Sequence, residues 1–152
     1  MSYSNLRVGR ASIPGQTYLI TTVTAQRKRL FEDYLLGRVV VKTIRSLDET
    51  AICHTLALVV MPDHVHWLFE LDRAHTLAQT IKLFKGRAAT AINTYLKRQG
   101  QVWQQSFHDH AVRSDESLIE MARYVIMNPV RAGMIKHIGD YPLWDSMWMD
   151  PL

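Results

Sequence analysis

Two consecutive apolar runs joined by a tight turn constrain the fold of this chain more than any other feature. Residues 51–61 form a long apolar run that is typical of a buried strand, and residues 64–71 predict a second strand. Pro62 and Asp63 stand between the runs and favour a tight turn. The two strands are therefore expected to pair as a hairpin.

The remaining segments alternate between strand and helix patterns. Apolar spacing and turn signals predict a strand at 16–26, a helix at 33–48, a helix at 76–99, a short strand at 106–113 and a helix from about 114 to 127. Ser114 is the expected N-cap of that last helix, and Asn128-Pro129 interrupts it. In the helix at 76–99, Tyr95 is assigned to the apolar stripe and Gly100 to the C-cap.

This order of elements, β-α-β-β-α-β-α, predicts the fold class. Four strands with intervening helices favour an α+β fold with a ferredoxin-like antiparallel sheet covered by helices. Tyr124 lies on the helix that follows the fourth strand. The 152 residues suit one domain, and the aromatic tail from about residue 139 is expected to pack back on it.

Composition narrows the environment and the partners. Cys53 is the only cysteine, which excludes an intrachain disulfide and a cysteine-based zinc site and fits a reducing cytoplasm. Residues 1–10 are polar and no apolar run is long enough to span a bilayer, so neither a signal peptide nor a membrane segment is expected. The net charge of +4 permits a polyanionic partner without requiring one.

A pair of histidines directly follows the turn. His64 and His66 are two apart on a predicted strand, so both imidazoles project from the same face while Val65 points the other way. Both rings are then able to reach one metal ion. Packing of the two rings against neighbouring side chains is the alternative.

Tyr124 and Asn128 are four apart on a predicted helix and therefore share a face. Core packing of Tyr124 and a helix-terminal role of Asn128 are the simpler interpretation. The chemical interpretation makes Tyr124 a nucleophile aided by a metal that His64 and His66 hold. With Asn128 as a third, neutral oxygen ligand, such a site suits Mg²⁺ or Mn²⁺, although zinc is the commoner partner of histidine alone.

The pattern around these residues resembles a known family. The segment 59–66, ending in His64-Val65-His66, resembles the signature of HUH endonucleases and, more narrowly, of single-tyrosine transposases that act on single-stranded DNA. Three further segments are similar to the REP-associated tyrosine transposases: Pro14-Gly15 with Tyr18, Thr21, Thr22, Thr24, Arg27 and Phe31; 102–113; and 124–133. The tail departs from the family pattern, because members often read Tyr-Pro-Trp-Ser-Ser whereas this chain reads Tyr141-Pro142-Leu143-Trp144-Asp145-Ser146.

This resemblance implies a role for each candidate residue. Tyr124 corresponds to the nucleophile that forms a 5′-phosphotyrosine link and releases a 3′-hydroxyl. His64 and His66 correspond to the ligands of a divalent metal, Mg²⁺ or Mn²⁺, and Asn128 to a third, amide ligand. The implied partner is single-stranded DNA with hairpins from palindromic repeats, bound by a monomer or a homodimer.

Other polar and aromatic residues have two interpretations each. A set of basic residues is expected either to contact DNA phosphates or simply to form solvated surface. They are Arg10, Arg27, Lys28, Arg29, Lys82, Lys85, Arg87 and Arg131. Asp63 is a turn residue or orients an imidazole. His108 and His110 repeat the His-x-His spacing and are assigned a structural or DNA-contacting role. Most aromatic residues are expected in the core, and a few, with Trp67 or Trp103 as the candidates, are expected to stack on unpaired bases.

The expected function is therefore a metal-dependent endonuclease and strand transferase for single-stranded DNA. The first alternative is a regulatory DNA-binding protein that descends from such an enzyme and no longer cuts. The second is a metal-dependent phosphodiesterase that uses activated water in place of Tyr124.

Overall fold

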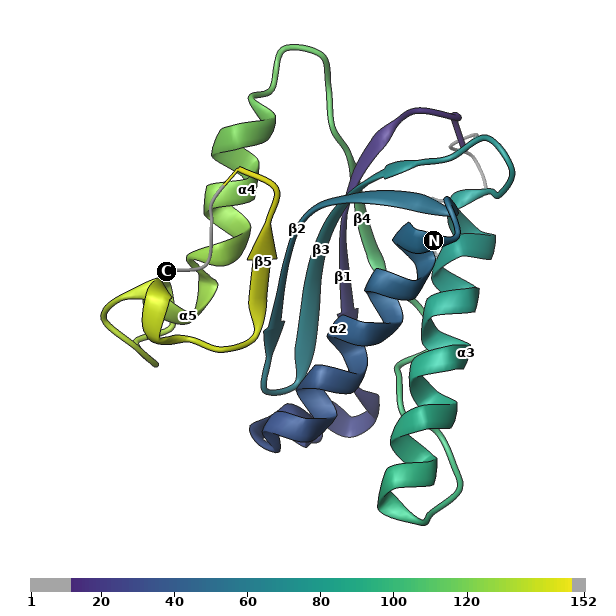
Figure 1. Ribbon diagram of the computed structural model, residues 1–152, viewed down its shortest axis with the longest axis vertical. Coiled ribbons are helices and arrows are strands. Elements are labelled where there is room, and N and C mark those ends of the chain that lie inside the picture. The colour runs from purple at the N-terminus through teal and green to yellow at the C-terminus, as the bar shows by residue number, and fades with distance from the viewer. Residues whose placement is uncertain (1–11, 149–152) are drawn as a thin grey trace.

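The computed structural model describes residues 12–148, and one antiparallel sheet organises them. Its five strands lie in the order β4-β1-β3-β2-β5 (Figure 1). The strands are β1 (Thr17–Val23), β2 (Cys53–Met61), β3 (His64–Leu71), β4 (His108–Ala111) and β5 (Trp144–Ser146). The helices are α2 (Tyr34–Glu49), α3 (Leu77–Leu96), α4 (Leu118–Ile126) and the single turn α5 (Asn128–Arg131). Short 3₁₀ turns lie at Ala25–Arg27, Leu30–Glu32 and Ile138–Asp140. The predicted α+β class with a ferredoxin-like antiparallel sheet is confirmed.

Strands β2 and β3 form the predicted hairpin in the middle of the sheet. Met61 pairs with His64 across the turn, and strand β1 pairs with the other edge of β3, placing Thr21 opposite His66. Both histidines therefore lie on a strand that pairs with a neighbouring strand on each side, which fixes their backbone positions.

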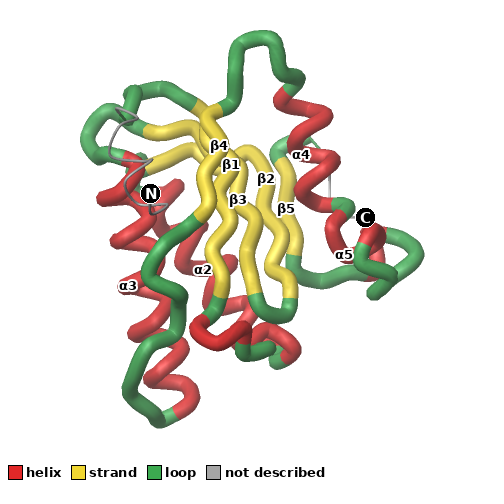
Figure 2. Tube along the Cα trace, turned by 180° about the vertical axis from the view of Figure 1, so that it is seen from behind, coloured by secondary structure: helices red, strands yellow, loops and turns green. Residues whose placement is uncertain are grey.

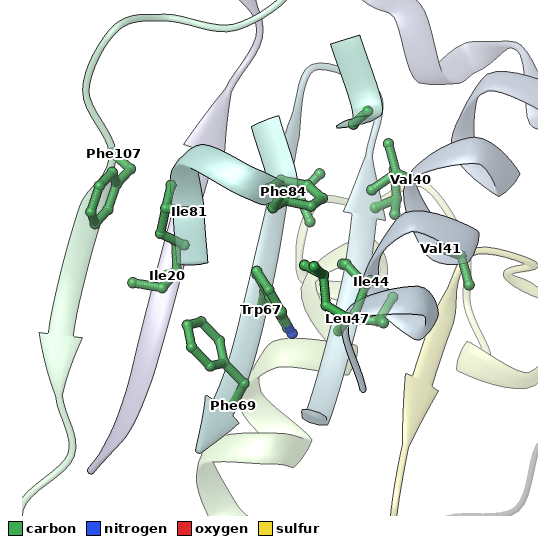
Figure 3. Close-up of a cluster of buried hydrophobic side chains, with 14 of the residues drawn as sticks. Ile20, Val40, Val41, Ile44, Leu47, Trp67, Phe69, Ile81, Phe84 and Phe107 are labelled. Atoms are coloured by element: carbon green, nitrogen blue, oxygen red, sulfur yellow. The ribbon is translucent and has the colours of Figure 1, made fainter. Parts of the chain in front are cut away.

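The larger apolar core fills the space between one face of the sheet and helices α2 and α3. Trp67 and Phe69 of β3 stack with ring centroids 4.1 Å apart, and Phe84 of α3 covers Trp67 at 5.3 Å (Figure 3). Ile44 of α2 and Ile20 of β1 are fully buried in the same cluster. Because side chains alternate along a strand, this cluster takes the odd-numbered residues of β3.

A smaller core covers part of the opposite face, under helix α4. Val125 and Ile126 of α4 pack with Val59 of β2 and Leu68 of β3. Figure 1 shows α4 beside β5, away from α2 and α3, and Figure 2 shows the sheet and α4 from behind. By alternation, the even-numbered residues of β3, including His64 and His66, lie on this α4 face of the sheet.

The C-terminal segment returns to the sheet as a strand that the sequence analysis did not predict. The Val60 N–H donates to the carbonyl of Leu143 at 2.9 Å, and the Tyr141 hydroxyl donates to the Val60 carbonyl at 2.5 Å. Strand β5 then pairs with β2. The side chain of Leu143 packs so closely against Gly37 of α2 that a β-carbon at residue 37 would clash with it. Only three residues form this strand, too few for a periodic pattern.

Three local predictions were wrong. Helix α4 begins after Ser117, whose hydroxyl accepts from the Glu120 N–H at 3.3 Å, and not after Ser114. Helix α3 ends at Lys97 in the left-handed conformation, three residues before Gly100. Tyr95 is 45% exposed, because the last turn of α3 extends beyond the sheet that buries its apolar stripe (Figure 1).

No helix among residues 12–148 is both long and apolar enough to cross a membrane.

Candidate active site

His64 and His66 stand side by side at the start of β3. Their ring centroids are 4.8 Å apart and their planes meet at 84°. Both side chains are partly exposed, whereas Val65 between them is buried in the larger core. The period of two along a strand, which predicted a shared face, therefore brings two imidazoles together on the α4 face.

Asp63 orients the ring of His64. Its Oδ1 atom lies 2.7 Å from Nδ1 of His64, and its Oδ2 atom accepts from the guanidinium of Arg27 at 3.2 Å. Partial burial raises the pKa of the Asp63 carboxyl, but the hydrogen bond and charge interaction with His64, followed by Arg27, outweigh it and lower that pKa. An ionised Asp63 accepts the Nδ1 proton of His64 and leaves Nε2 as the ring nitrogen for a ligand.

Thr21 of β1 orients the ring of His66 in the same way. Its hydroxyl oxygen lies 2.9 Å from Nδ1 of His66, so Nε2 is again the remaining nitrogen. Burial, the charge of His64 and the charge of Arg131 together lower the pKa of His66 to about 4. His66 is therefore neutral near pH 7, which is the form in which imidazole binds a metal.

Tyr124 projects from α4 on the same side of the sheet. Its side chain is 61% exposed, while its neighbours Val125 and Ile126 are buried against β2 and β3. The guanidinium carbon of Arg131 lies 3.8 Å from the centroid of the Tyr124 ring. The charge of Arg131 is also a cause of the lowered pKa of His66, after burial and the charge of His64.

Asn128 begins α5, one turn after Tyr124. Its side-chain Nδ2 donates to the carbonyl of Val125 at 2.8 Å and, more weakly, to that of Tyr124 at 3.4 Å. Pro129 has no N–H to offer Val125, so the amide of Asn128 replaces that helix hydrogen bond. Because the NH₂ group faces these carbonyls, Oδ1 points away from the helix and is the atom left to bind a ligand.

The donor set fits a divalent metal with an incomplete protein shell. Among residues 12–148, no three histidine, cysteine, aspartate or glutamate side chains gather around one point. Two imidazoles whose Nδ1 atoms are engaged, together with one amide oxygen, would leave several coordination positions for substrate and water. A divalent metal held by these atoms would be able to polarise a phosphate oxygen.

The predicted DNA-contacting residues lie in different parts of the chain. Arg10 is outside the described residues. Arg27 pairs with Asp63, Arg29 pairs with Glu32, and Lys28 is exposed beside them. Lys82, Lys85 and Arg87 belong to α3 and therefore lie on the opposite side of the sheet from His64 and His66. Lys85 donates to the carbonyls of Gln104 and Ser106 at 2.8 and 3.0 Å, which ties the loop before β4 to α3.

The expectation that tryptophans stack on bases was wrong for both residues named. Trp67 is 1% exposed and donates from Nε1 to the Thr55 hydroxyl at 2.9 Å, and Trp103 packs between Phe31 and Phe84. Both rings are core residues and have no free face for a base.

His108 and His110 lie on the edge strand β4. His108 is opposite Thr21, and His110 shares a hydrogen bond with Glu116 at 2.9 Å. His108 therefore belongs to the same side of the sheet as the first pair, on the edge strand that lies two strands away from β3.

Comparison with known proteins identifies the family of this chain. The model of the family described as "Transposase IS200 like" matches residues 12–128, a range that contains His64, His66, Tyr124 and Asn128. The chain belongs to the IS200-like transposase family. The resemblance inferred from the four sequence motifs is thereby confirmed.

Curated relatives of this IS200-like chain carry a narrower name. A Haemophilus influenzae protein provisionally named a REP-associated tyrosine transposase is 27% identical over 143 residues, covering 84% of this chain and 78% of the relative. The REP-associated tyrosine transposase of Escherichia coli K12 is 28% identical over 88 residues, covering 57% of this chain and 50% of the relative.

Solved structures share the fold. A structure described as a REP-associated tyrosine transposase bound to a REP hairpin superposes with a TM-score of 0.69 and 24% identity, covering 89% of this chain and 79% of that one. A Deinococcus radiodurans protein described as a transposase gives a TM-score of 0.56 and 23% identity, with 72% and 87% covered. At these identities the likeness establishes the architecture of the IS200-like chain and no residue's role.

The sequence analysis gave Thr21 no role at the site, and it left two roles open for Asp63, as a turn residue or as the residue that orients an imidazole. The hydrogen bond of Thr21 to His66 depends on which residue of β1 lies opposite His66, and the sequence does not reveal the register of two strands separated by helix α2 and strand β2. Asp63 carried a usable signal, because a carboxylate directly before a histidine ligand is a common orienting group.

Proposed function

We propose that this protein is a metal-dependent endonuclease and strand transferase for single-stranded DNA, which acts beside hairpins of palindromic repeats through a 5′-phosphotyrosine intermediate. The observation that carries the proposal is the placement of Tyr124 and the His64–His66 pair on one side of the sheet, with the guanidinium of Arg131 over the Tyr124 ring. The proposal includes a cytoplasmic location and a monomeric or homodimeric enzyme.

In the proposed cleavage step, the phenolic oxygen of Tyr124 attacks the phosphorus of one phosphodiester. The phenol loses its proton, the bond between phosphorus and the 3′ oxygen breaks, the 5′ phosphate stays on Tyr124, and the 3′ oxygen takes up one proton and leaves as a hydroxyl. Attack of a 3′-hydroxyl on the phosphotyrosine reverses these bonds and joins a strand. A divalent metal held by His64, His66 and Asn128 would supply charge stabilisation at the phosphate.

The substrate class follows from the relatives. Two curated relatives are named for REP elements, and one solved structure with this fold is described as bound to a REP hairpin. We therefore propose hairpin-bearing single-stranded DNA as the partner of this chain, gripped largely through phosphates by basic residues.

One gel separates this proposal from its two alternatives. Incubation with Mn²⁺ and a labelled single strand that carries a palindromic-repeat hairpin should give a covalent protein–DNA adduct that survives denaturation. A phosphodiesterase that activates water would cut the strand without forming the adduct, and a regulatory DNA-binding descendant would bind the strand and leave it intact.

We expect the protein to cut the single-stranded form of a palindromic sequence and to leave its fully paired duplex uncut. Melting a duplex costs about 1.4 kcal/mol of stacking for each base-pair step, which a small, mildly basic domain does not readily recover. The measurement compares one sequence as single strand and as annealed duplex, at fixed salt and metal. Equal cutting of the two forms would refute the proposed substrate class, but it would not contradict the assignment of the catalytic residues.

We expect Asp63→Ala to weaken Mn²⁺ binding by about 10- to 100-fold, because Nδ1 of His64 loses the acceptor that orients the ring. Calorimetric titration with Mn²⁺ measures the affinity directly. Asp115→Ala is the matched control, since that carboxylate is 75% exposed and lies on the loop before α4. An unchanged affinity in Asp63→Ala would show that Asp63 serves only the turn.

A further inference from the structure

Arg131 and Tyr124 form a stacked pair on the surface of the protein. Their separation of 3.8 Å is well within the range of about 6 Å over which a cation is attracted to the face of an aromatic ring. The Tyr124 ring is 61% exposed, so the core under α4 does not fix its direction. The guanidinium carbon of Arg131 lies over one face of the ring.

The backbone between the two residues explains why they meet. Helix α4 ends at Ile126, and α5 continues after Met127, where the Arg131 N–H donates to the Met127 carbonyl at 2.9 Å. Side chains on a helix lean toward its N-terminus, so Arg131 reaches back over the preceding turn toward Tyr124. The amide of Asn128 holds the joint together through Val125. The position of Arg131 therefore depends on the Asn-Pro junction.

Arg131 also lies on the side of the sheet that carries the histidine pair, because α5 directly follows α4 there. A flexible arginine used only to hold DNA phosphates needs no contact with the Tyr124 ring. Here the guanidinium carbon lies over that ring.

We propose that Arg131 is a positioning residue, which holds the Tyr124 ring in a fixed direction on the side of the sheet that carries His64 and His66. The inference rests on the proposed function for its catalytic consequence, but the ordering of the ring is independent of it. Restricting an exposed nucleophile to one direction reduces the search for an in-line approach to phosphorus. The sequence analysis assigned Arg131 only a DNA contact.

Cleavage rates distinguish the two roles. With a saturating single-stranded oligonucleotide that carries one palindromic-repeat hairpin, Arg131→Ala should slow single-turnover cleavage by about 10- to 100-fold, because small misplacements of a reacting group have effects of this size. The dissociation constant and its salt dependence should stay unchanged. Arg131→Lys should remain slow, because it keeps the charge and loses the planar group that stacks.

Arg123→Ala is the matched control for charge, since Arg123 is an exposed arginine directly before Tyr124 on α4, and its cleavage rate should equal that of the unmodified protein. The inference is overturned if Arg131→Lys cleaves normally. It is also overturned if Arg131→Ala weakens binding, reduces the salt slope by about one and leaves the saturated rate intact, which is the behaviour of a phosphate contact.

A second measurement works without cleavage. Ring resonances of Tyr124 in the labelled full-length protein, assigned by their loss in Tyr124→Phe, should show greater nanosecond mobility in Arg131→Ala than in Arg123→Ala. Equal mobility in all forms overturns the inference. If the unmodified protein forms no covalent adduct, the proposed function fails, and this comparison alone decides whether Arg131 orders the ring.

Discussion

Tyr124→Phe is expected to abolish DNA cleavage and the covalent adduct while leaving DNA binding and folding nearly intact. The substitution removes only the attacking oxygen, and loss of a nucleophile usually lowers the rate by several orders of magnitude. The ring is 61% exposed, and the hydrophobic contacts of α4 come from Val125 and Ile126, so the fold does not depend on the hydroxyl. A denaturing gel detects the adduct, and a binding titration measures the affinity.

Tyr95→Phe is the matched control for this substitution. Tyr95 is a similarly exposed tyrosine, at 45%, but it lies on α3. Its variant should cut DNA at the normal rate. Retention of more than about one part in a thousand of the normal rate by Tyr124→Phe would remove Tyr124 from the role of nucleophile and favour activated water.

The double variant His64→Ala/His66→Ala should lose metal-dependent cleavage entirely. It deletes both imidazoles whose Nε2 atoms face away from their hydrogen-bond partners, leaving no strong ligand in the proposed site. Titration calorimetry with Mn²⁺ should show no binding, and an activity titration should show no response to metal. His54→Ala serves as the control, because His54 is exposed at the far end of the hairpin, opposite Glu70.

Asn128→Ala should change metal dependence in the same direction but less, since an amide oxygen is a weaker ligand than imidazole. It also removes the hydrogen bond that closes the helix joint at Val125. Its unfolding midpoint must therefore be measured beside its metal affinity. Unchanged metal dependence in the double histidine variant would refute the site as a whole.

Local patterns predicted the elements better than their ends. The hairpin and the helix before it follow from apolar periods that a few residues express on their own, and both are present with small shifts. The N-cap of α4 was misplaced because Ser114 and Ser117 offer the same chemistry three residues apart, and packing of the helix on β2 selects Ser117. Strand β5 was missed because its pairing partner lies far away in the chain.

The two tryptophans proposed to stack on DNA bases are buried in the core instead. A tryptophan in a basic DNA-binding protein is a plausible base-stacking group, yet Trp67 and Trp103 occupy the centre of the larger core. Their sequence positions do not reveal this, because which face of the sheet the two large helices cover is decided by the assembled fold. Conversely, Tyr124 is exposed although its apolar neighbours on α4 are buried.

The sequence by itself determined that this chain is an α+β domain of a transposase family and that His64 and His66 share one face. The physical reason is that strand periodicity and motif spacing are properties of short segments. Only the tertiary structure decided that Thr21 and Asp63 orient the two rings, that α3 places its lysines on the other side of the sheet, and that Arg131 stacks on Tyr124. Apart from the contact between the neighbours Asp63 and His64, these contacts join segments distant in sequence or cross a break in a helix, so they exist only once strand register and helix packing are fixed.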